Sequence, residues 1–281
     1  MERAAELARA GAAEGTLVWA RRQTKGRGRH GRVWESPAGG IYCSIILRPT
    51  RPQQDIPQLS LVAGLSVAET IWKVAAGPGS HSLRRYARLA PARLAFARPS
   101  GPRSSRPGMP GRDTVPASGL RTPGLSERLP PAATNAVFPT IRWPNDVLIN
   151  DKKVAGIIAE SKGGAVMVGI GINVTTRQDD LPKTATSLKT AGASCDPLQL
   201  TGTLYQRFMA WYDIWSREGF GPIRAALRPW IGLFGQPVHI VAGTERCEGT
   251  ALDVDETGRL IVRLNSGLLR PFEVGEVTVL R

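Results

Sequence analysis

The sequence predicts an α/β (α+β) protein in which a mixed β-sheet is backed by helices and is followed by a small all-β domain. Three observations support this fold class. Apolar residues recur at helical spacing in three segments, and short apolar runs typical of buried strands lie between these segments. Five short strand patterns then fill residues 235–281. A chain of 281 residues is long enough for one sizeable core and a second, smaller domain.

The first elements alternate between helix and strand. The segment from Glu2 to Ala12 is rich in alanine and has apolar residues at helical spacing, so it predicts a helix. Strands are expected at Thr16–Ala20 and Ile41–Leu47, on either side of a glycine- and arginine-rich loop. Residues 58–76 carry a broad apolar face at helical spacing, and the Gly-Pro-Gly sequence at 77–79 ends that helix.

Residues 78–137 differ from the rest of the chain in composition. Eleven of the 22 prolines lie between Pro78 and Pro139, and aromatic residues are few. Such a segment buries too little apolar surface to offset its chain entropy, so we predict a disordered Arg/Pro-rich insertion. A surface insertion is tolerated because loop-closure entropy grows slowly with length. A frame error in a GC-rich gene would give the same composition and remains an alternative.

Order is expected to return at Ile141. Val147–Ile149, Val154–Ala159 and Ala165–Val174 are typical of successive strands. Asp196 and Pro197 then provide a helix N-cap and a proline at the first helical position. The helix that follows should dock on the sheet through apolar residues spaced three or four apart, namely Leu200, Leu204, Phe208, Trp211 and Trp215.

The C-terminal segment has the pattern of a small β-barrel. Glycine and polar residues separate five short apolar stretches, and the sequence Asp255 to Gly258 is typical of a turn. The expected strands are Val238–Val241, Cys247–Val254, Arg259–Leu264, Leu268–Phe272 and Val277–Leu280.

Composition excludes several classes of protein. The chain has no run of 18 apolar residues and no signal-peptide pattern, so no membrane partner is expected. Its three cysteines show neither metal spacing nor a disulfide framework, which favours the reducing cytoplasm. Its three histidines form no constellation, and no metal site is expected in the protein itself. The net charge of +14 suggests a polyanion partner, but +8 of it lies in residues 78–140, so no specific nucleic acid is expected.

A glycine- and arginine-rich loop, from Gln23 to Trp34, carries the clearest chemical signal. Glycine allows close backbone approach, and arginine presents a fork of donors that suits phosphate or carboxylate. The loop therefore predicts an anion cradle. The spacing of Gly26, Gly28 and Gly31 matches a dinucleotide fingerprint, but no helix is expected to follow, so that interpretation fails. A solvated basic loop and an RGG-like nucleic-acid segment remain alternatives.

Three further stretches complete a recognisable series. Trp143-Pro-Asn-Asp146 is followed by Lys153-Val-Ala-Gly156 and then by Gly169-Ile-Gly-Ile-Asn-Val174. In this order, and after the Gly-Arg-Gly-Arg-x-Gly-Arg loop, they closely resemble the biotin–protein ligase family. The resemblance implies a class II synthetase-like catalytic domain made of residues 1–77 and 138–234, with the insertion between them. It also implies an SH3-like domain at residues 235–281.

The resemblance implies an activity and its substrates. Such a ligase uses ATP to form biotinyl-5'-AMP from biotin and then transfers biotin to a lysine of a biotin carboxyl carrier protein. Mg²⁺ is expected from the ATP chemistry, and the oligomeric state is expected to be a monomer or a homodimer. Arg29 and Lys153 would be catalytic, with Lys152 exposed on the opposite face of its strand.

The family's binding residues can be carried over to matching positions. Biotin or biotinyl-AMP would contact Gln23, Gly26, Arg27, Gly28, Arg29, Trp34, Lys153, Gly156 and Gly171. The ATP and adenine side would be formed by Asn173, Asn145 and Asp146. A plain core role is the alternative for Trp34, and fixing the turn after Pro144 is the alternative for Asn145 and Asp146. Arg142 replaces a family lysine, which keeps the charge but changes its geometry.

Departures from the family pattern leave rival interpretations open. A strand and a Ser-Thr motif that helps to bind the biotin head group are expected before the first helix, and Met1 falls about where that motif should end. This departure indicates either a wrong start codon or an incomplete biotin pocket. No helix-turn-helix repressor domain is expected before the first helix of the sequence. The alternatives are a lipoate-type ligase of the same fold, a catalytically impaired remnant, and a basic nucleic-acid-binding protein.

Overall fold

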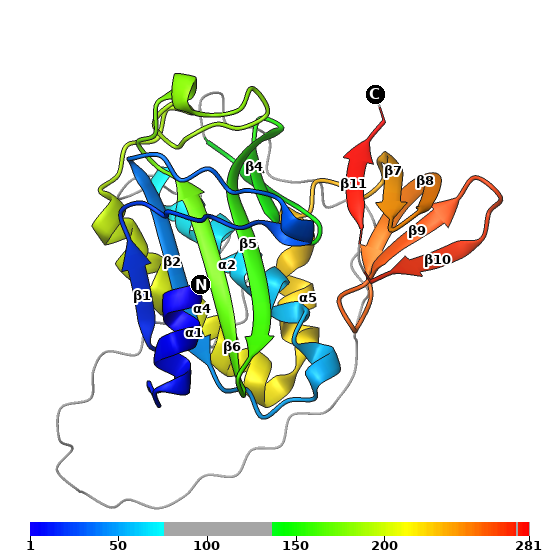
Figure 1. The fold of residues 1–281 in the computed structure, drawn as a ribbon. Helices are drawn as coiled ribbons and strands as arrows, with labels where there is room; N and C mark the ends of the chain where they lie inside the picture. The colour runs from blue at the N-terminus through cyan, green and yellow to red at the C-terminus, as the bar shows by residue number, and fades with distance from the viewer. Residues whose placement is uncertain (76–136, 274, 281) are drawn as a thin grey trace, which may run out of the picture.

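The computed structural model describes residues 1–75, 137–273 and 275–280. The described chain forms two parts, a larger one with a six-stranded sheet and helices and a smaller one built only of strands (Figure 1). The fold class predicted from the sequence is confirmed. The predicted disordered insertion at residues 78–137 lies almost wholly outside the described residues.

The six-stranded sheet runs continuously across the long interruption between residues 75 and 137. Its strand order is β1-β2-β6-β5-β4-β3, so strands from both sides of the interruption pair through β2 and β6. Every strand pair that the structure describes in this sheet is antiparallel, and parallel pairing is limited to two isolated bridges, 153 to 185 and 141 to 231. The strands are β1 (Leu17–Ala20), β2 (Gly40–Leu47), β3 (Pro139–Arg142), β4 (Asp146–Ile149), β5 (Lys152–Lys162) and β6 (Ala165–Asn173).

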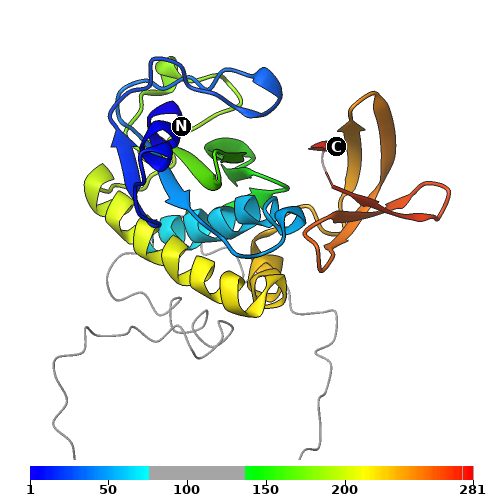
Figure 2. The same ribbon diagram turned by 60° about the horizontal axis from the view of Figure 1, so that its bottom comes forward.

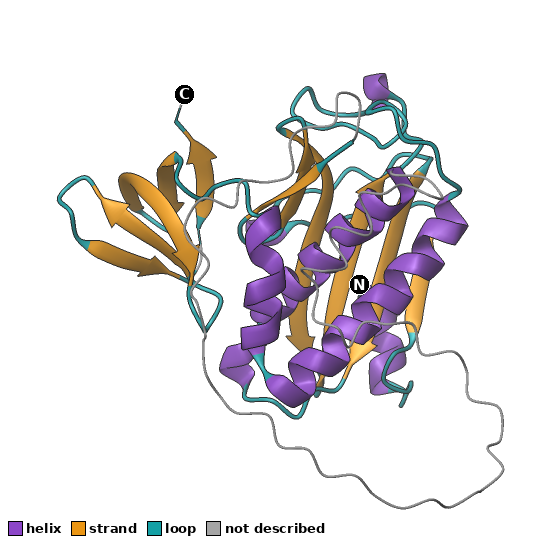
Figure 3. Cartoon of the chain, turned by 180° about the vertical axis from the view of Figure 1, so that it is seen from behind, coloured by secondary structure: helices purple, strands orange, loops and turns teal. Residues whose placement is uncertain are grey.

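Helices cover the two faces of this sheet unequally. The helices α2 (Gln58–Ala75), α4 (Pro197–Glu218) and α5 (Phe220–Leu227) lie on one face, where the main core forms (Figures 2 and 3). On the other face lies α1 (Glu2–Arg9), whose buried alanines pack against Ile46 of β2. Since side chains alternate along a strand, Ile46 faces α1 while its neighbours face the main core. Because α1 is short, much of this face of the sheet is left uncovered by helices that the structure describes.

Most elements agree with the sequence patterns to within a few residues, and the predicted N-cap of α4 is confirmed. The Asp196 side chain accepts a hydrogen bond from the Gln199 amide, and Pro197 begins the helix. The chain that follows the interruption packs along α2: the Ile141 side chain lies near Gly64, and Phe138 meets Trp72 near the helix end with ring centroids 5.3 Å apart.

The smaller part is a five-stranded antiparallel sheet in the order β10-β9-β8-β7-β11. Its turn at Asp255 is held by hydrogen bonds from Thr257 and Arg259 to the carboxylate. Burial raises the pKa of Asp255, but these hydrogen bonds outweigh it and lower the pKa overall. The strands are β7 (Pro237–Ala242), β8 (Glu245–Val254), β9 (Leu260–Leu264), β10 (Leu269–Phe272) and β11 (Glu276–Val279).

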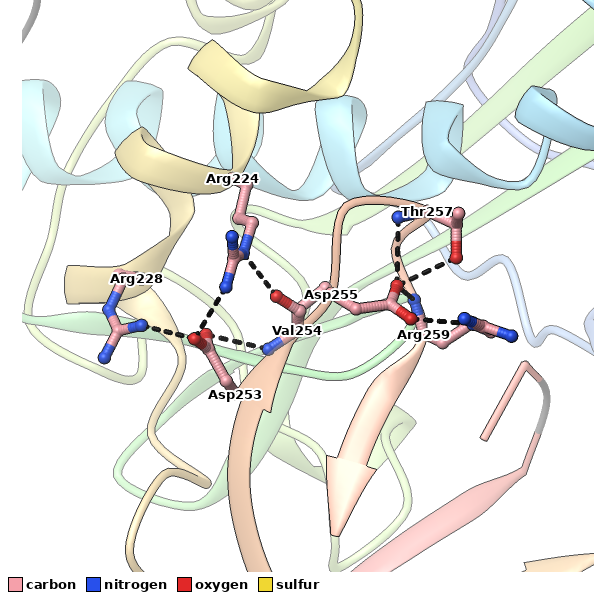
Figure 4. Close-up of polar contacts among 7 residues, drawn as sticks. All are labelled: Arg224, Arg228, Asp253, Val254, Asp255, Thr257 and Arg259. Carbon is pink, nitrogen blue, oxygen red and sulfur yellow. Dashed lines mark hydrogen bonds and ion pairs between the residues drawn. The ribbon is translucent and has the colours of Figure 1, made fainter. Parts of the chain in front are cut away.

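Polar contacts fix the smaller part against the larger one (Figure 4). Arg224 of α5 and Arg228, the residue that follows this helix, both reach the Asp253 carboxylate, at 2.9 and 2.5 Å, and Arg224 also donates to the Val254 carbonyl. At the end of the turn that begins at Asp255, the Gly258 carbonyl accepts a hydrogen bond from the buried Trp143 indole at 2.9 Å. These contacts join the end of β8 and the following turn to α5 and to the residue after β3.

Replacing Asp253 by alanine is expected to destabilise the protein by about 1–2 kcal/mol, because two guanidinium groups lose a partly buried charged acceptor. Thermal unfolding should show this as a fall in Tm of a few degrees. Asp213→Ala is the matched control, since its ion pair with Arg217 is exposed and lies within one helix. An equal fall in Tm for both variants would contradict the assigned role of Asp253.

Candidate active site

A cavity of about 490 Å³ opens on the sheet face that α1 leaves free. Its floor is made of small residues from three neighbouring strands, Ser44 of β2, Gly169 and Gly171 of β6, and Gly156 of β5. Gly156 and Gly171 are partners in the β5–β6 register, so their missing side chains leave one continuous gap.

Among the residues that the structure describes, none of the helices has the length and apolar character of a membrane span.

The Trp34 indole lies over this pair of glycines. A Cβ atom added at Gly156 would lie 2.8 Å from the Trp34 ring, and one at Gly171 would also lie 2.8 Å from it. Real Cβ atoms do not approach so closely, so the ring requires glycine at both positions. The Trp34 indole nitrogen is buried and has no hydrogen-bond partner among the described residues. The Trp34 ring therefore lines the cavity, while its indole nitrogen is a buried donor that no described residue satisfies.

The glycine- and arginine-rich loop folds back on itself as a small hairpin. The Gly28 amide donates to the Arg32 carbonyl at 2.7 Å, and the Trp34 amide donates to the Gly26 carbonyl at 3.1 Å. A Cβ atom at Gly26 would lie 2.0 Å from the Trp34 carbonyl oxygen, so the loop cannot close with a larger residue there. The hairpin holds its arginines at the rim of the cavity.

Arg29 points from this loop toward the turn before β4. Its guanidinium donates to the Asn145 side-chain oxygen at 3.0 Å, and the Asn145 amide group donates to the Ile157 carbonyl of β5. Burial lowers the pKa of Arg29 below its ordinary value, while Asp146 and Glu276 act in the opposite direction. An arginine stays protonated despite such a shift, so the site holds a fixed positive charge.

Lys153 reaches the cavity from β5. Its ammonium lies 2.6 Å from one Asp146 carboxylate oxygen and 5.1 Å from the centroid of the Trp34 ring. Arg142, from the end of β3, donates to the other Asp146 oxygen at 2.7 Å. One carboxylate thus holds two cations side by side, as expected for charge-assisted hydrogen bonds.

A β-bulge explains why Lys153 faces the cavity. In regular alternation Lys153 would share a face with Ala155 and Ile157, which are buried in the main core. The β4–β5 register shifts, so that Val147 pairs with Ala155 and Leu148 pairs with Lys153. The extra residue reverses the direction of Lys153 and brings it next to Gly156. Lys152 is exposed and does not line the cavity.

The structure brings most of the predicted site residues to the cavity. Two do not line it: Gly26 shapes the loop from behind, and Asn173 is buried at 2% exposure beneath residues 184–188. The predicted residues that line it are Gln23, Arg27, Gly28, Arg29, Trp34, Asn145, Asp146, Lys153, Gly156 and Gly171.

Sequence reasoning missed several parts of the cavity wall, among them the start of the chain at Met1–Arg3, Tyr42 and Glu276. Tyr42 lies on the floor side, where its hydroxyl donates to the Pro37 carbonyl and burial raises its pKa to about 12. Glu276, in β11 of the smaller part, forms an ion pair with Arg32. The alternation of side chains along β2 could have indicated that Tyr42 faces the cavity. No local pattern in the sequence could have indicated the ion pair between Arg32 and Glu276.

The arrangement is suited to anions. Eight cationic side chains line the cavity: Arg3, Arg22, Lys25, Arg27, Arg29, Arg32, Arg142 and Lys153. The described residues do not fit a protein-held divalent metal, because no group of three metal-binding side chains is found among them and both Asp146 oxygens already face cations. The cavity can hold carboxylate and phosphate groups next to each other and next to an aromatic ring.

Comparison with known protein families gives the decisive observation. The pattern described as "Biotin/lipoate A/B protein ligase family" matches residues 4–176, more than half of the chain. The chain belongs to this ligase family. A second pattern, "Biotin protein ligase C terminal domain", matches residues 233–280 and therefore covers the smaller part.

Several curated proteins are similar to this family member along most of its length. "Bifunctional ligase/repressor BirA" of Bacillus subtilis is 30% identical over 94% of the chain, and the chain covers 66% of that protein. "Biotin--[acetyl-CoA-carboxylase] ligase" of Paracoccus denitrificans is 30% identical over 89% of the chain and 85% of that protein. The corresponding ligase of Mycobacterium tuberculosis is 28% identical over 95% of the chain and 80% of that protein.

Solved structures support the fold of the biotin/lipoate ligase family. The biotin protein ligase from Aquifex aeolicus in complex with biotin and ATP has a TM-score of 0.66 and 24% identity, and the match covers 96% of this chain and 90% of that one. The apo structure of the same Aquifex protein has a TM-score of 0.65 and 20% identity. The two-part architecture is therefore a known arrangement.

Proposed function

We propose that this chain is a biotin–protein ligase, which activates biotin with ATP and attaches it to a lysine of a biotin carboxyl carrier protein. One observation carries the proposal: the arginine-rich hairpin and Lys153 line one cavity, in a chain whose larger part matches the biotin/lipoate ligase pattern and whose smaller part matches the biotin protein ligase C-terminal pattern. The relatives named as ligases for acetyl-CoA carboxylase support this choice of acceptor.

In the first reaction, a biotin carboxylate oxygen attacks the α-phosphorus of ATP. The new P–O bond forms biotinyl-5'-AMP, and the bond to pyrophosphate breaks with its electron pair on the leaving oxygen. Arg29 and the Gly28 region of the hairpin offset the charge of the two anions that must meet, which is the main barrier to this step. ATP is expected to arrive as its Mg²⁺ complex, so that the metal belongs to the substrate.

In the second reaction, the amine of the acceptor lysine attacks the acyl carbon of the adenylate. The C–N bond forms, AMP leaves, and the amine loses a proton. The Lys153 ammonium, held between Asp146 and the Trp34 ring, can stabilise the negative charge that develops on the acyl and phosphate oxygens. Trp34 offers its face to the adenylate above the glycine pair.

Biotin is the preferred acid, because the match at residues 233–280 is to the C-terminal domain of biotin protein ligases. Gln23 lines the cavity, where its side-chain oxygen accepts a hydrogen bond from Ser36, and we propose that it contacts the biotin end of the ligand. We propose a cytoplasmic enzyme that acts as a monomer or homodimer. The three cysteines are free, as expected in a reducing compartment.

Exchange of labelled pyrophosphate into ATP tests the proposal. We expect exchange that requires biotin and is not supported by lipoate, because residues 233–280 match the C-terminal domain of biotin protein ligases. Addition of a biotin carboxyl carrier protein should then give a biotinylated acceptor of increased mass. Exchange that depends on lipoate, or the absence of exchange with either acid, would contradict the proposal.

A further inference from the structure

The cations that line the cavity are mostly arginines, although lysine would supply the same charge. Six of the eight are arginine and two are lysine. An acyl adenylate reacts with amines, whereas a guanidinium stays protonated in a protein and offers no electron pair for attack. Arginine therefore gives positive charge that biotinyl-AMP cannot acylate. The chain has seven lysines, all within the part that the structure describes, and of these Lys25 and Lys153 line the cavity.

These two lysines have different surroundings. The Lys153 nitrogen is engaged, because it lies 2.6 Å from an Asp146 carboxylate oxygen and 5.1 Å from the centroid of the Trp34 ring. The Lys25 side chain is exposed and makes no hydrogen bond or ion pair with any residue that the structure describes. Of the two amines in the cavity, Lys25 is therefore the one that is free to move toward a bound electrophile.

The backbone on both sides of Lys25 is fixed. The Gln23 side-chain oxygen accepts a hydrogen bond from Ser36 at 2.8 Å, and the Gly26 carbonyl accepts one from the Trp34 amide at 3.1 Å. The Trp34 ring in turn lies over the glycine pair where the adenylate is proposed to bind. Lys25 thus starts from a fixed position at the same cavity, and only its flexible side chain must be ordered, which raises its effective concentration at the adenylate.

We propose that Lys25 is a site of self-biotinylation. The inference rests on the proposed formation of biotinyl-AMP in this cavity. When no acceptor protein is bound, the neutral Lys25 amine attacks the acyl carbon and a C–N bond forms. The C–O bond to AMP breaks with its electron pair on the phosphate oxygen, and the amine proton passes to water, to which Lys25 is exposed. The resulting amide is uncharged, so the modification removes one positive charge from the cavity.

Incubation of the whole protein with biotin, ATP and Mg²⁺, without an acceptor, tests the proposal. We expect the mass to increase by one biotinyl group and trypsin to stop cleaving after Lys25. The rate constant should not depend on protein concentration, because the reaction occurs within one molecule. Lys25→Arg keeps the charge but removes the nucleophile, and it should lower biotin incorporation at least about tenfold, as loss of a positioned reactant does.

Lys162→Arg is the matched control, since Lys162 is exposed and does not line the cavity. Its incorporation of biotin should equal that of the original protein.

Chemically prepared biotinyl-5'-AMP separates this proposal from the proposed function. Labelling of Lys25 by this reagent, but not by biotin and ATP, would contradict the adenylation step and support the assignment of Lys25. No labelling by the prepared adenylate would overturn the assignment. A biotinyl group found on Lys153, on the amino group of Met1, which also lines the cavity, or equally on all exposed lysines would overturn it as well. These measurements use the original protein and do not depend on the folding of a variant.

Discussion

Replacing Lys153 by alanine is expected to reduce biotinylation of an acceptor protein by about 10³-fold, while the protein stays folded. The side chain contributes a positive charge to the cavity and little packing, since it is partly exposed and pairs with Asp146. Incorporation of biotin into the carrier protein, followed by mass spectrometry under single-turnover conditions, measures the loss. Thermal unfolding of the variant checks that its fold is retained.

Lys152→Ala is the control for this experiment. It removes the same charge one residue earlier, from an exposed side chain outside the cavity, so activity should change by less than about twofold. A comparable loss in both variants would contradict the assigned direction of Lys153.

A third variant, in which Val154 is deleted, removes the extra residue of the bulge and should turn Lys153 toward the core, with loss of activity.

The second large effect is expected for Arg29→Ala. Loss of one preorganised cationic donor should slow adenylate formation about 10²–10³-fold, equivalent to roughly 3–4 kcal/mol of transition-state stabilisation. The first-turnover release of pyrophosphate is the direct measurement, because it precedes transfer to the acceptor. The variant should also release biotinyl-AMP more quickly, since the hairpin loses part of its anion neutralisation.

Arg21→Ala separates a local effect from a change in total charge. Arg21 is an exposed arginine that precedes the same loop and does not line the cavity. Its loss should leave pyrophosphate release nearly unchanged at physiological salt. An unchanged rate in Arg29→Ala, or an equal decrease in Arg21→Ala, would show that the contact between Arg29 and Asn145 has no part in adenylation.

Elements with strong periodicity could be predicted well from the sequence. The apolar spacing of α2 and α4 reflects burial of one helical face, and the Asp196-Pro197 pair fixes the start of α4 through a local hydrogen bond. Such signals lie within a few residues of the structure they produce. The short strand β3 and the helix α5 were not identified, because β3 has only four residues and α5 contains two interrupting residues, glycine and proline.

The site was less predictable, because its geometry depends on contacts between distant residues. The resemblance to the family indicated the arginine-rich loop and Lys153, yet simple strand alternation does not explain why Lys153 faces the cavity. The bulge lies in the pairing of β5 with β4, and Lys153 also bridges to Ala185; no local pattern reveals either contact. For the same reason neither the buried position of Asn173 nor the cavity wall at Glu276 could be predicted.

The ion pair between Arg32 and Glu276 also has a consequence for biosynthesis. The two residues are 244 positions apart, so the hairpin leaves the ribosome long before its partner strand exists. At about 5–20 residues per second, this interval is about 12–50 s. During that time the cavity lacks the wall that β11 provides. A nascent or prematurely terminated chain that has folded its larger part would present an open anion site, and full competence would begin only with the last strand.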